Sequence, residues 1–217
     1  PRRFGKTLNL SMIRHYVEWT PEDDATSLGK RQALFADLAV WGAGDEIRRH
    51  FGAYPVIWLT FKDVKCSTWG EACANIARLV ADEVQRHLPT FESALPAGER
   101  DLLDVLLSGR WDALTAQALN RLSAWLHRAT GRKVVILVDE YDTPLHEAHA
   151  RGYWDEANSF FRNLFSGAFK DNVHLERGVL TGILRVAKES LFSGLNNIGV
   201  HTLLSQEFCA HFGFTPA

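Results

Sequence analysis

Five consecutive apolar residues, Val134–Val138, limit the fold of this 217-residue chain more than any other segment. Lys133 precedes the run and Asp139 follows it. A strand with one exposed face alternates apolar and polar residues, whereas an unbroken apolar run is expected of a strand buried on both faces. Such strands belong to parallel sheets that helices cover on both sides. The run therefore predicts an α/β fold.

The rest of the pattern alternates strands with helices. Two further strands are expected at 54–61 and 175–181. Apolar residues at helical spacing predict helices, which we place at 6–19, 69–88, 99–108, 111–130 and 153–170. Residues 27–52 fit only short helical pieces. We therefore expect three layers, α/β/α, around a mostly parallel sheet, with residues 1–217 in one domain that carries a helical insert at roughly 69–130.

The composition restricts the environment and the partners of the chain. A content of 46% hydrophobic and 23% charged residues is typical of a globular domain, and a formal charge of −2 gives no direct signal for nucleic acid. No apolar run is long enough to cross a membrane, so no membrane association is expected. The cysteines form no Cys-x-x-Cys pair, which favours a reducing, cytoplasmic location. Cys73 has a core-facing helical position and is expected to be a buried apolar side chain.

The tripeptide Gly5-Lys6-Thr7 stands at the start of the first expected helix. It matches the second half of a Walker A loop, in which backbone N–H groups hold phosphate, the lysine reaches the terminal phosphates and the threonine hydroxyl can ligate magnesium. The first glycine of that motif would fall one residue before Pro1, and we expect the strand that feeds the loop to be missing. Because such a triplet arises by chance in about one chain in ten of this length, a glycine turn with a surface lysine is the alternative.

Asp139 and Glu140 directly follow the buried strand. An apolar strand that delivers an aspartate at its carboxyl end is the Walker B pattern, whose aspartate holds magnesium. Glu140 can then act as the general base that polarises an attacking water. The alternative is a strand that ends in a solvated acidic turn. The two motifs occur in the expected order, and together they predict a site for a nucleoside triphosphate and Mg²⁺.

Thr181 lies at the end of the third expected strand, and Arg185 follows it. Since ligands bind at the carboxyl ends of parallel strands, Thr181 can orient the γ-phosphate and its water, and Arg185 can reach developing charge in cis or across a subunit interface. The alternatives are a strand-end cap for Thr181 and a surface salt bridge for Arg185. His146 and His149 do not form a His-Glu-x-x-His motif, and a loop or helix start is preferred to a metal site there.

With these residues placed, the sequence resembles the AAA-ATPase-like proteins, large ATPases that are often joined to a PD-(D/E)XK nuclease-like domain. The stretches that carry the resemblance run in order along the chain and lie at 1–12, 54–64, 135–148, 181–190 and 192–197. The resemblance implies a P-loop NTPase fold with an extra strand between the Walker A and Walker B strands. It also implies ATP and Mg²⁺ as cofactors. The nuclease-like domain would lie outside these residues, and a homo-oligomer is possible.

By this resemblance each motif residue receives a role. The roles are phosphate and nucleotide binding for Gly5, Lys6, Thr7 and Leu8, magnesium binding for Thr7 and Asp139, and water activation for Glu140. The loop is degenerate because it lacks its first glycine, so Arg2 and Arg3 are expected to take over part of the phosphate contact.

The leading interpretation is Mg-dependent ATP hydrolysis. A nucleotide-dependent switch with negligible turnover is the main alternative, favoured by the degenerate loop, and an interaction domain without nucleotide is a third. We further expect the missing strand to be flanked by the strands that end at Asp139 and Thr181. The chain as it stands should then have a gap or a displaced Lys6 there, and should bind ATP poorly.

Overall fold

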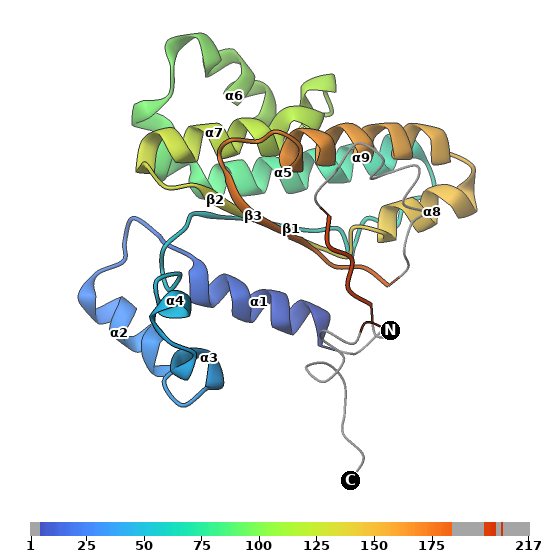
Figure 1. Cartoon of the computed structure of the whole chain (residues 1–217). Coiled ribbons are helices and arrows are strands. Elements are labelled where there is room, and N and C mark those ends of the chain that lie inside the picture. The colour runs from blue at the N-terminus through green and yellow to red at the C-terminus, as the bar shows by residue number, and fades with distance from the viewer. Residues whose placement is uncertain (1–4, 184–197, 203–204, 206–217) are drawn as a thin grey trace.

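The computed structural model describes residues 5–183, 198–202 and 205. Within these residues the centre of the fold is a sheet of three parallel strands in the order β1–β2–β3 (Figure 1). The strands are β1 (Val56–Thr60), β2 (Val134–Asp139) and β3 (Leu175–Leu180). Each coincides with an expected strand, so the α/β class and the parallel sheet are confirmed.

Helices cover both faces of the sheet, which gives the three expected layers (Figure 1). One layer lies on the face opposite α1 and contains α5 (Trp69–Phe91), α6 (Arg100–Leu107), α7 (Ala118–Thr130), α8 (Thr143–Arg151) and α9 (Trp154–Phe169). Short 3-10 turns connect these helices at Glu92–Ala94, Ala97–Glu99 and Ala113–Gln117. The other layer contains α1 (Lys6–Val17) and, beside it, α2 (Ala25–Ala33), α3 (Ala39–Gly42) and α4 (Asp45–Arg48).

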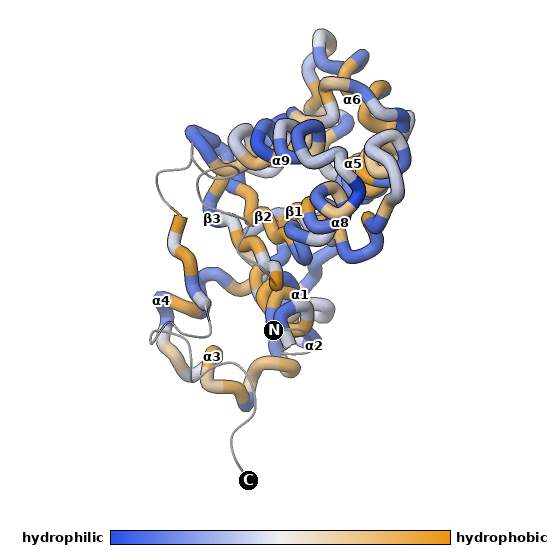
Figure 2. Tube along the Cα trace, turned by 90° about the vertical axis from the view of Figure 1, so that its right-hand side faces the viewer, coloured by the Kyte–Doolittle hydropathy of each residue, from blue (hydrophilic) through white to orange (hydrophobic). Residues whose placement is uncertain are grey.

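The core lies on both sides of β2, all six residues of which are buried. Towards α5, α7 and α9 the core includes Ile136, Trp125 and Phe165, and towards α1 it includes Leu10 and Leu137. Figure 2 shows the hydrophobic residues gathered along the strands in the middle of the molecule. The burial of β2 on both faces is the property that its unbroken apolar sequence predicts.

The segment between α1 and β1 is held by aromatic side chains. Tyr16 of α1 makes edge-to-face contacts with Phe35 and Phe51, with ring centroids 5.2 and 5.4 Å apart, and Trp41 packs on Phe51 at 5.3 Å. Edge-to-face aromatic pairs add stability beyond the area they bury. These contacts pack α3 and the residues that follow α2 and α4 against α1.

One expectation about the sheet is wrong. The strands that end at Asp139 and before Thr181 were expected to flank a missing strand, but β2 and β3 pair directly, with Val135 opposite Arg177 and Val138 opposite Leu180. The reason is that β1 and β3 together satisfy the backbone hydrogen bonds of β2 on both sides, so no gap exists between β2 and β3. The outer edge of β3 has no strand partner among the described residues.

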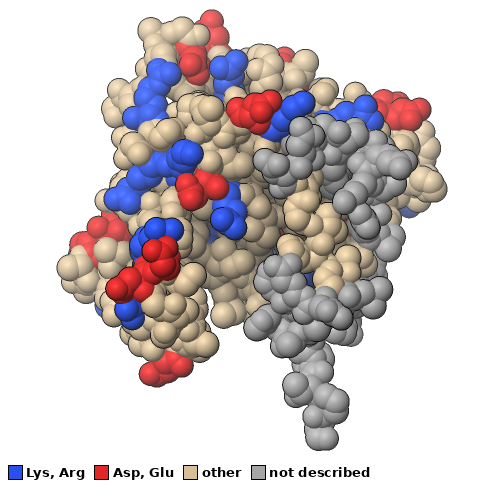
Figure 3. All heavy atoms as spheres, in the orientation of Figure 1, with Lys and Arg blue, Asp and Glu red and all other residues tan. Residues whose placement is uncertain are grey.

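Cys73 is buried, as expected, and burial raises the pKa of its thiol to about 12. The thiol therefore stays protonated and packs as a small apolar group. Within the described residues no helix is both long and apolar enough to cross a lipid bilayer. On the face shown in Figure 3, basic and acidic side chains are interspersed.

A histidine pair joins the end of α7 to the start of β3. The Nδ1 atoms of His127 and His174 lie 2.9 Å apart. Burial, the charge of His127 and the charge of Arg128 lower the pKa of His174. A lowered pKa in the folded state means that the unfolded chain binds the proton more tightly, so the free energy of unfolding should fall as the pH drops below about 6.5.

His174→Asn should reduce this pH dependence, because asparagine does not titrate. Urea unfolding at about pH 5.5 and 7.5 should give a smaller difference in free energy of unfolding for the variant than for the parent. The control is His149→Asn, which changes an exposed histidine of α8. The same pH dependence in His174→Asn and the parent would contradict the assignment.

Candidate functional site

The carboxylate of Asp139 joins three elements at the carboxyl end of the sheet. Thr7 Oγ1 of α1 donates a hydrogen bond to Asp139 Oδ2 at 2.8 Å, and Thr181 Oγ1 donates to Asp139 Oδ1 at 2.5 Å. Asp139 is only 1% exposed. Thr7 and Asp139 are 132 residues apart in sequence, so the fold assembles the contact. Three residues expected to carry chemistry therefore meet at one point.

Backbone hydrogen bonds fix Thr181 beside Asp139. The Thr181 N–H donates to the Val138 carbonyl at 2.9 Å, and the Tyr141 N–H donates to the Thr181 carbonyl at 3.1 Å. The β2–β3 ladder thus continues one step past the ends of the strands. This backbone ladder, and not the contact between the side chains, places Asp139 and Thr181 next to each other.

The junction between the loop and α1 depends on a glycine. Gly5 has a φ of 73° at the N-terminal cap of α1, and its carbonyl accepts the Asn9 N–H at 2.8 Å. This left-handed backbone is readily adopted by glycine and costs other residues energy. Lys6 and Thr7 then form the first turn of the helix, and the Leu8 side chain is 66% exposed.

Glu140 has an unusual backbone conformation. Its φ is 50°, a left-handed value that non-glycine residues rarely adopt. Its N–H lies 3.4 Å from Thr181 Oγ1, and its Oε2 accepts the Thr143 hydroxyl at 3.2 Å. Strained backbone of this kind costs about 1–3 kcal/mol and clusters at functional sites. Thr143 was not singled out from the sequence as a site residue.

The chain after β3 approaches the chain after β2 closely at Gly182. A Cβ atom there would lie 2.8 Å from Asp142 Oδ1 and 2.9 Å from the Tyr141 ring. The Ile183 N–H donates to Asp142 Oδ2 at 2.8 Å, and His146 Nε2 lies 3.5 Å from the same oxygen. Asp142, which is 1% exposed, therefore braces the two loops that carry Glu140 and Thr181.

Thr60 of β1 completes a row of polar residues, Thr60, Asp139 and Thr181, that runs across the ends of the three strands. It is the register partner of Asp139, so the two side chains lie on the same face of the sheet. Its Oγ1 is buried and has no hydrogen-bond partner within the described part of the chain. Buried hydroxyls normally have a partner, which makes this one a candidate to bind a ligand or its water. The polar residue at the end of the first strand was the signal that could have identified it.

The Thr7–Asp139 pair fits a magnesium ion. Mg²⁺ prefers six oxygen ligands at 2.0–2.1 Å in an octahedron, so neighbouring ligand oxygens lie about 2.9 Å apart. Thr7 Oγ1 and Asp139 Oδ2 are 2.8 Å apart. The described residues contain no group of three or more His, Cys, Asp or Glu side chains that could hold a metal ion, at this pair or elsewhere. His146 and His149 are part of α8.

Three of the expected site residues cannot be placed. Arg2, Arg3 and Arg185 lie outside the residues that the structure describes. The described residues from the sequence prediction fall into one group around Asp139, formed by Thr7, Glu140 and Thr181, with Gly5, Lys6 and Leu8 at the adjoining end of α1.

Comparison with known proteins gives the family. The family model described as predicted AAA-ATPase matches residues 1–192, and the chain belongs to that family. The chain is also similar to an uncharacterized protein in the vnfD 5′ region of Azotobacter chroococcum mcd 1, with 30% identity over 199 residues. That match covers 91% of this chain and 32% of the relative, so the chain spans about a third of the relative's length. No solved structure matches the chain.

Two threonine-to-valine changes in the polar row should differ in their effect on stability. Thr181→Val removes a donor from the buried Asp139 carboxylate and should lower the free energy of unfolding by about 1–3 kcal/mol. Thr60→Val removes a buried hydroxyl that has no partner in the described structure, so its effect should stay within about 0.5 kcal/mol or be stabilising. Urea unfolding measures both, and equal losses would contradict this account of the row.

Proposed function

We propose that the protein is a P-loop ATPase that hydrolyses ATP with Mg²⁺ as cofactor. The observation that carries the proposal is the Thr7–Asp139 contact, because it brings together the two magnesium ligands that the Walker A and Walker B patterns require. Membership of the predicted AAA-ATPase family supports nucleotide binding in general. The hydrolytic step and the role of each residue are part of the proposal.

Phosphate binding is assigned to the N-terminal end of α1. A helix N-terminus presents backbone N–H groups and a positive dipole end to an anion, and no side chain in the described part of the chain caps the N-terminus of α1. Gly5 lets the loop enter the helix without steric cost, and the backbone of Thr7 and Leu8 continues the N–H array. Lys6 is assigned to the terminal phosphates. Arg2 and Arg3 add positive charge next to this loop.

Thr7 and Asp139 hold the metal side of the site. When bound there, Mg²⁺ neutralises charge on the β- and γ-phosphate oxygens. Asp139 is already oriented for this role by the Thr181 hydroxyl on its other oxygen. The Thr7 hydroxyl donates its proton to Asp139 and would keep its lone pairs for the metal.

Glu140 is the proposed general base. It takes a proton from water as the water oxygen attacks the γ-phosphorus and the bond to the β-phosphate oxygen breaks, which yields ADP and inorganic phosphate. The left-handed backbone of Glu140 turns its side chain out of the strand direction, and Thr143 holds one carboxylate oxygen. Thr181 can orient the γ-phosphate, and Arg185 can stabilise the developing charge.

The proposed fold places the strand that leads into Gly5 beside β3. β3 then separates the Walker A strand from β2, as in P-loop proteins with an extra strand between the two motifs.

Residues 1–217 act as one domain, in which the helices of roughly 69–130 form the inserted part of one layer. A cytoplasmic location, a homo-oligomer and a nuclease-like domain elsewhere in the full protein belong to the same proposal. Weak ATP binding by residues 1–217 alone stays a prediction, although the gap between β2 and β3 from which it was derived does not exist.

A nucleotide-dependent switch with negligible turnover is the second candidate. The observation that favours it is the Thr143 hydroxyl on the Glu140 carboxylate, because a base held in this way has one oxygen fewer for water. The switch would bind ATP at the same residues. Its signature is a nucleotide-dependent rise in melting temperature without release of phosphate.

Two variants separate binding from hydrolysis. Lys6→Ala should weaken ATP binding strongly, by about tenfold or more, because the charge that faces the terminal phosphates is lost. Glu140→Gln should keep binding and reduce kcat by about 100-fold or more, because the amide cannot accept the proton. The measurements are ATP binding and phosphate release in the full chain, with Lys30→Ala on the exposed part of α2 as a control. Wild-type hydrolysis in both variants would refute the proposal.

A further inference from the structure

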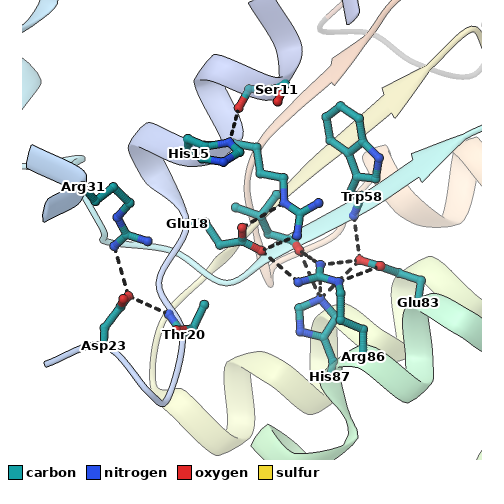
Figure 4. Close-up of polar contacts among 12 residues, drawn as sticks. Ser11, His15, Glu18, Thr20, Asp23, Arg31, Trp58, Glu83, Arg86 and His87 are labelled. Atoms are coloured by element: carbon teal, nitrogen blue, oxygen red, sulfur yellow. Dashed lines mark hydrogen bonds and ion pairs between the residues drawn. The ribbon is translucent and has the colours of Figure 1, made fainter. Parts of the chain in front are cut away.

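Side chains of α5 close the outer edge of β1. The Trp58 N–H donates to Glu83 Oε1 at 2.7 Å, and the Val56 carbonyl accepts from Arg86 Nη2 at 2.5 Å (Figure 4). These backbone groups face away from β2, since β2 pairs with the alternate residues of β1. His87 Nε2 also lies 3.0 Å from the Val56 carbonyl. The helix therefore satisfies the strand edge that another strand would otherwise occupy.

Arg86 extends this contact to α1. Its Nε donates to Glu83 Oε2 at 2.9 Å, while its Nη1 donates to Glu18 Oε1 at 2.8 Å (Figure 4). Glu18 is the C-terminal cap residue of α1, and Arg14 binds its other oxygen at 2.8 Å. The Glu83 and Glu18 side chains are 8% and 12% exposed. Arg86 thus bridges two largely buried carboxylates from different elements, and Arg14 is the second cation beside Glu18.

The charges in this cluster are fixed by their neighbours. Burial by itself raises the pKa of Glu83, but hydrogen bonds from Arg86 and His87 outweigh it and hold that pKa below its usual value. Burial likewise disfavours the charged form of Arg86, yet Glu83 and Glu18 raise the pKa of Arg86. Glu83 and Arg86 therefore stay ionised, and charge as well as hydrogen bonds maintains the geometry of the cluster.

The helix between this cluster and the candidate site is continuous. α1 contains 12 residues and is about 18 Å long, with Thr7 in its first turn and Glu18 at its end. The end of α1 is also tied to the chain before β1, because the Trp19 N–H donates to the Tyr54 carbonyl at 2.7 Å. A rigid helix transmits its position from one end to the other, so a shift at Glu18 moves Thr7 relative to Asp139.

We propose that Arg86 is a positioning residue for ATP turnover, which sets the axial position of α1 by holding Glu18 against the edge of β1. This inference rests on the proposed function. Arg86 touches neither Thr7 nor Asp139 in the described structure and acts through α1. Among the described residues, the proposed phosphate-binding groups Gly5–Leu8 lie at the start of α1 and move with it, whereas Asp139 and Glu140 lie at the end of β2. Displacement of α1 should therefore impair turnover far more than nucleotide binding, since misplacement by about 1 Å can cost about 100-fold.

The test uses Arg86→Lys, which keeps the charge but loses the forked donor geometry, and Glu18→Gln, which keeps the shape but loses the charge. In the full chain, each variant should lower kcat by about tenfold or more with KM for Mg-ATP changed less than about threefold, and the double variant should be no worse than the poorer single one. The control is Arg49→Lys in the exposed Arg49–Glu46 pair. All are assayed at a temperature at which circular dichroism shows them folded.

The possible outcomes separate the two proposals. A lower melting temperature with unchanged kcat in Arg86→Lys and Glu18→Gln, while Glu140→Gln loses turnover, assigns Arg86 a purely structural role and overturns the inference. Equal turnover in wild type and Glu140→Gln overturns the proposed function instead. Amide hydrogen exchange of residues 6–12 without nucleotide then decides whether Arg86 fixes α1 at all. Faster exchange in Arg86→Lys than in Arg49→Lys supports the role of Arg86 in fixing α1, and equal exchange in the two variants refutes that role.

Discussion

The hydrogen bonds that Asp139 accepts from Thr7 and Thr181 are the interaction on which the site depends. A carboxylate that is 1% exposed needs donors, because an ionised group without them would be costly to bury. Here the two donors come from a helix on one face of the sheet and from the neighbouring strand. The hydrogen bonds that offset the cost of burying the Asp139 carboxylate therefore also fix α1 and β3 relative to β2.

Two further groups support this arrangement from a distance. Asp142 braces the loops after β2 and β3, where Gly182 permits their close approach. At the opposite end of α1, Arg86 joins Glu18 to the edge of β1. The helix is thus held at both ends, by a neutral hydroxyl contact at Thr7 and by an ion pair at Glu18. A site whose parts belong to separate elements requires such restraints if its geometry is to be reproducible.

Much of this organisation could be predicted from the sequence because the relevant signals are local. The apolar run Val134–Val138 predicts a buried strand. Asp139 at the end of this strand and Thr181 at the end of the next one are then expected to meet at the same edge of the sheet. The strand order could not be predicted in the same way, since neighbours in a sheet are set by packing between distant segments. This is why β2 and β3 pair where a missing strand was expected. Arg86 and Glu18 are 68 residues apart, and no spacing links them.

The most direct test of the account asks whether Thr7 and Asp139 bind one metal ion. Mn²⁺ replaces Mg²⁺ at oxygen sites and can be titrated by electron paramagnetic resonance in the presence of ATP. The account predicts that Thr7→Val and Asp139→Asn each weaken Mn²⁺ binding to the ATP complex by about tenfold or more, and that the double variant loses less than the product of the two effects. Wild-type affinity for Mn²⁺ in both single variants would contradict the account, because the metal would then be bound elsewhere.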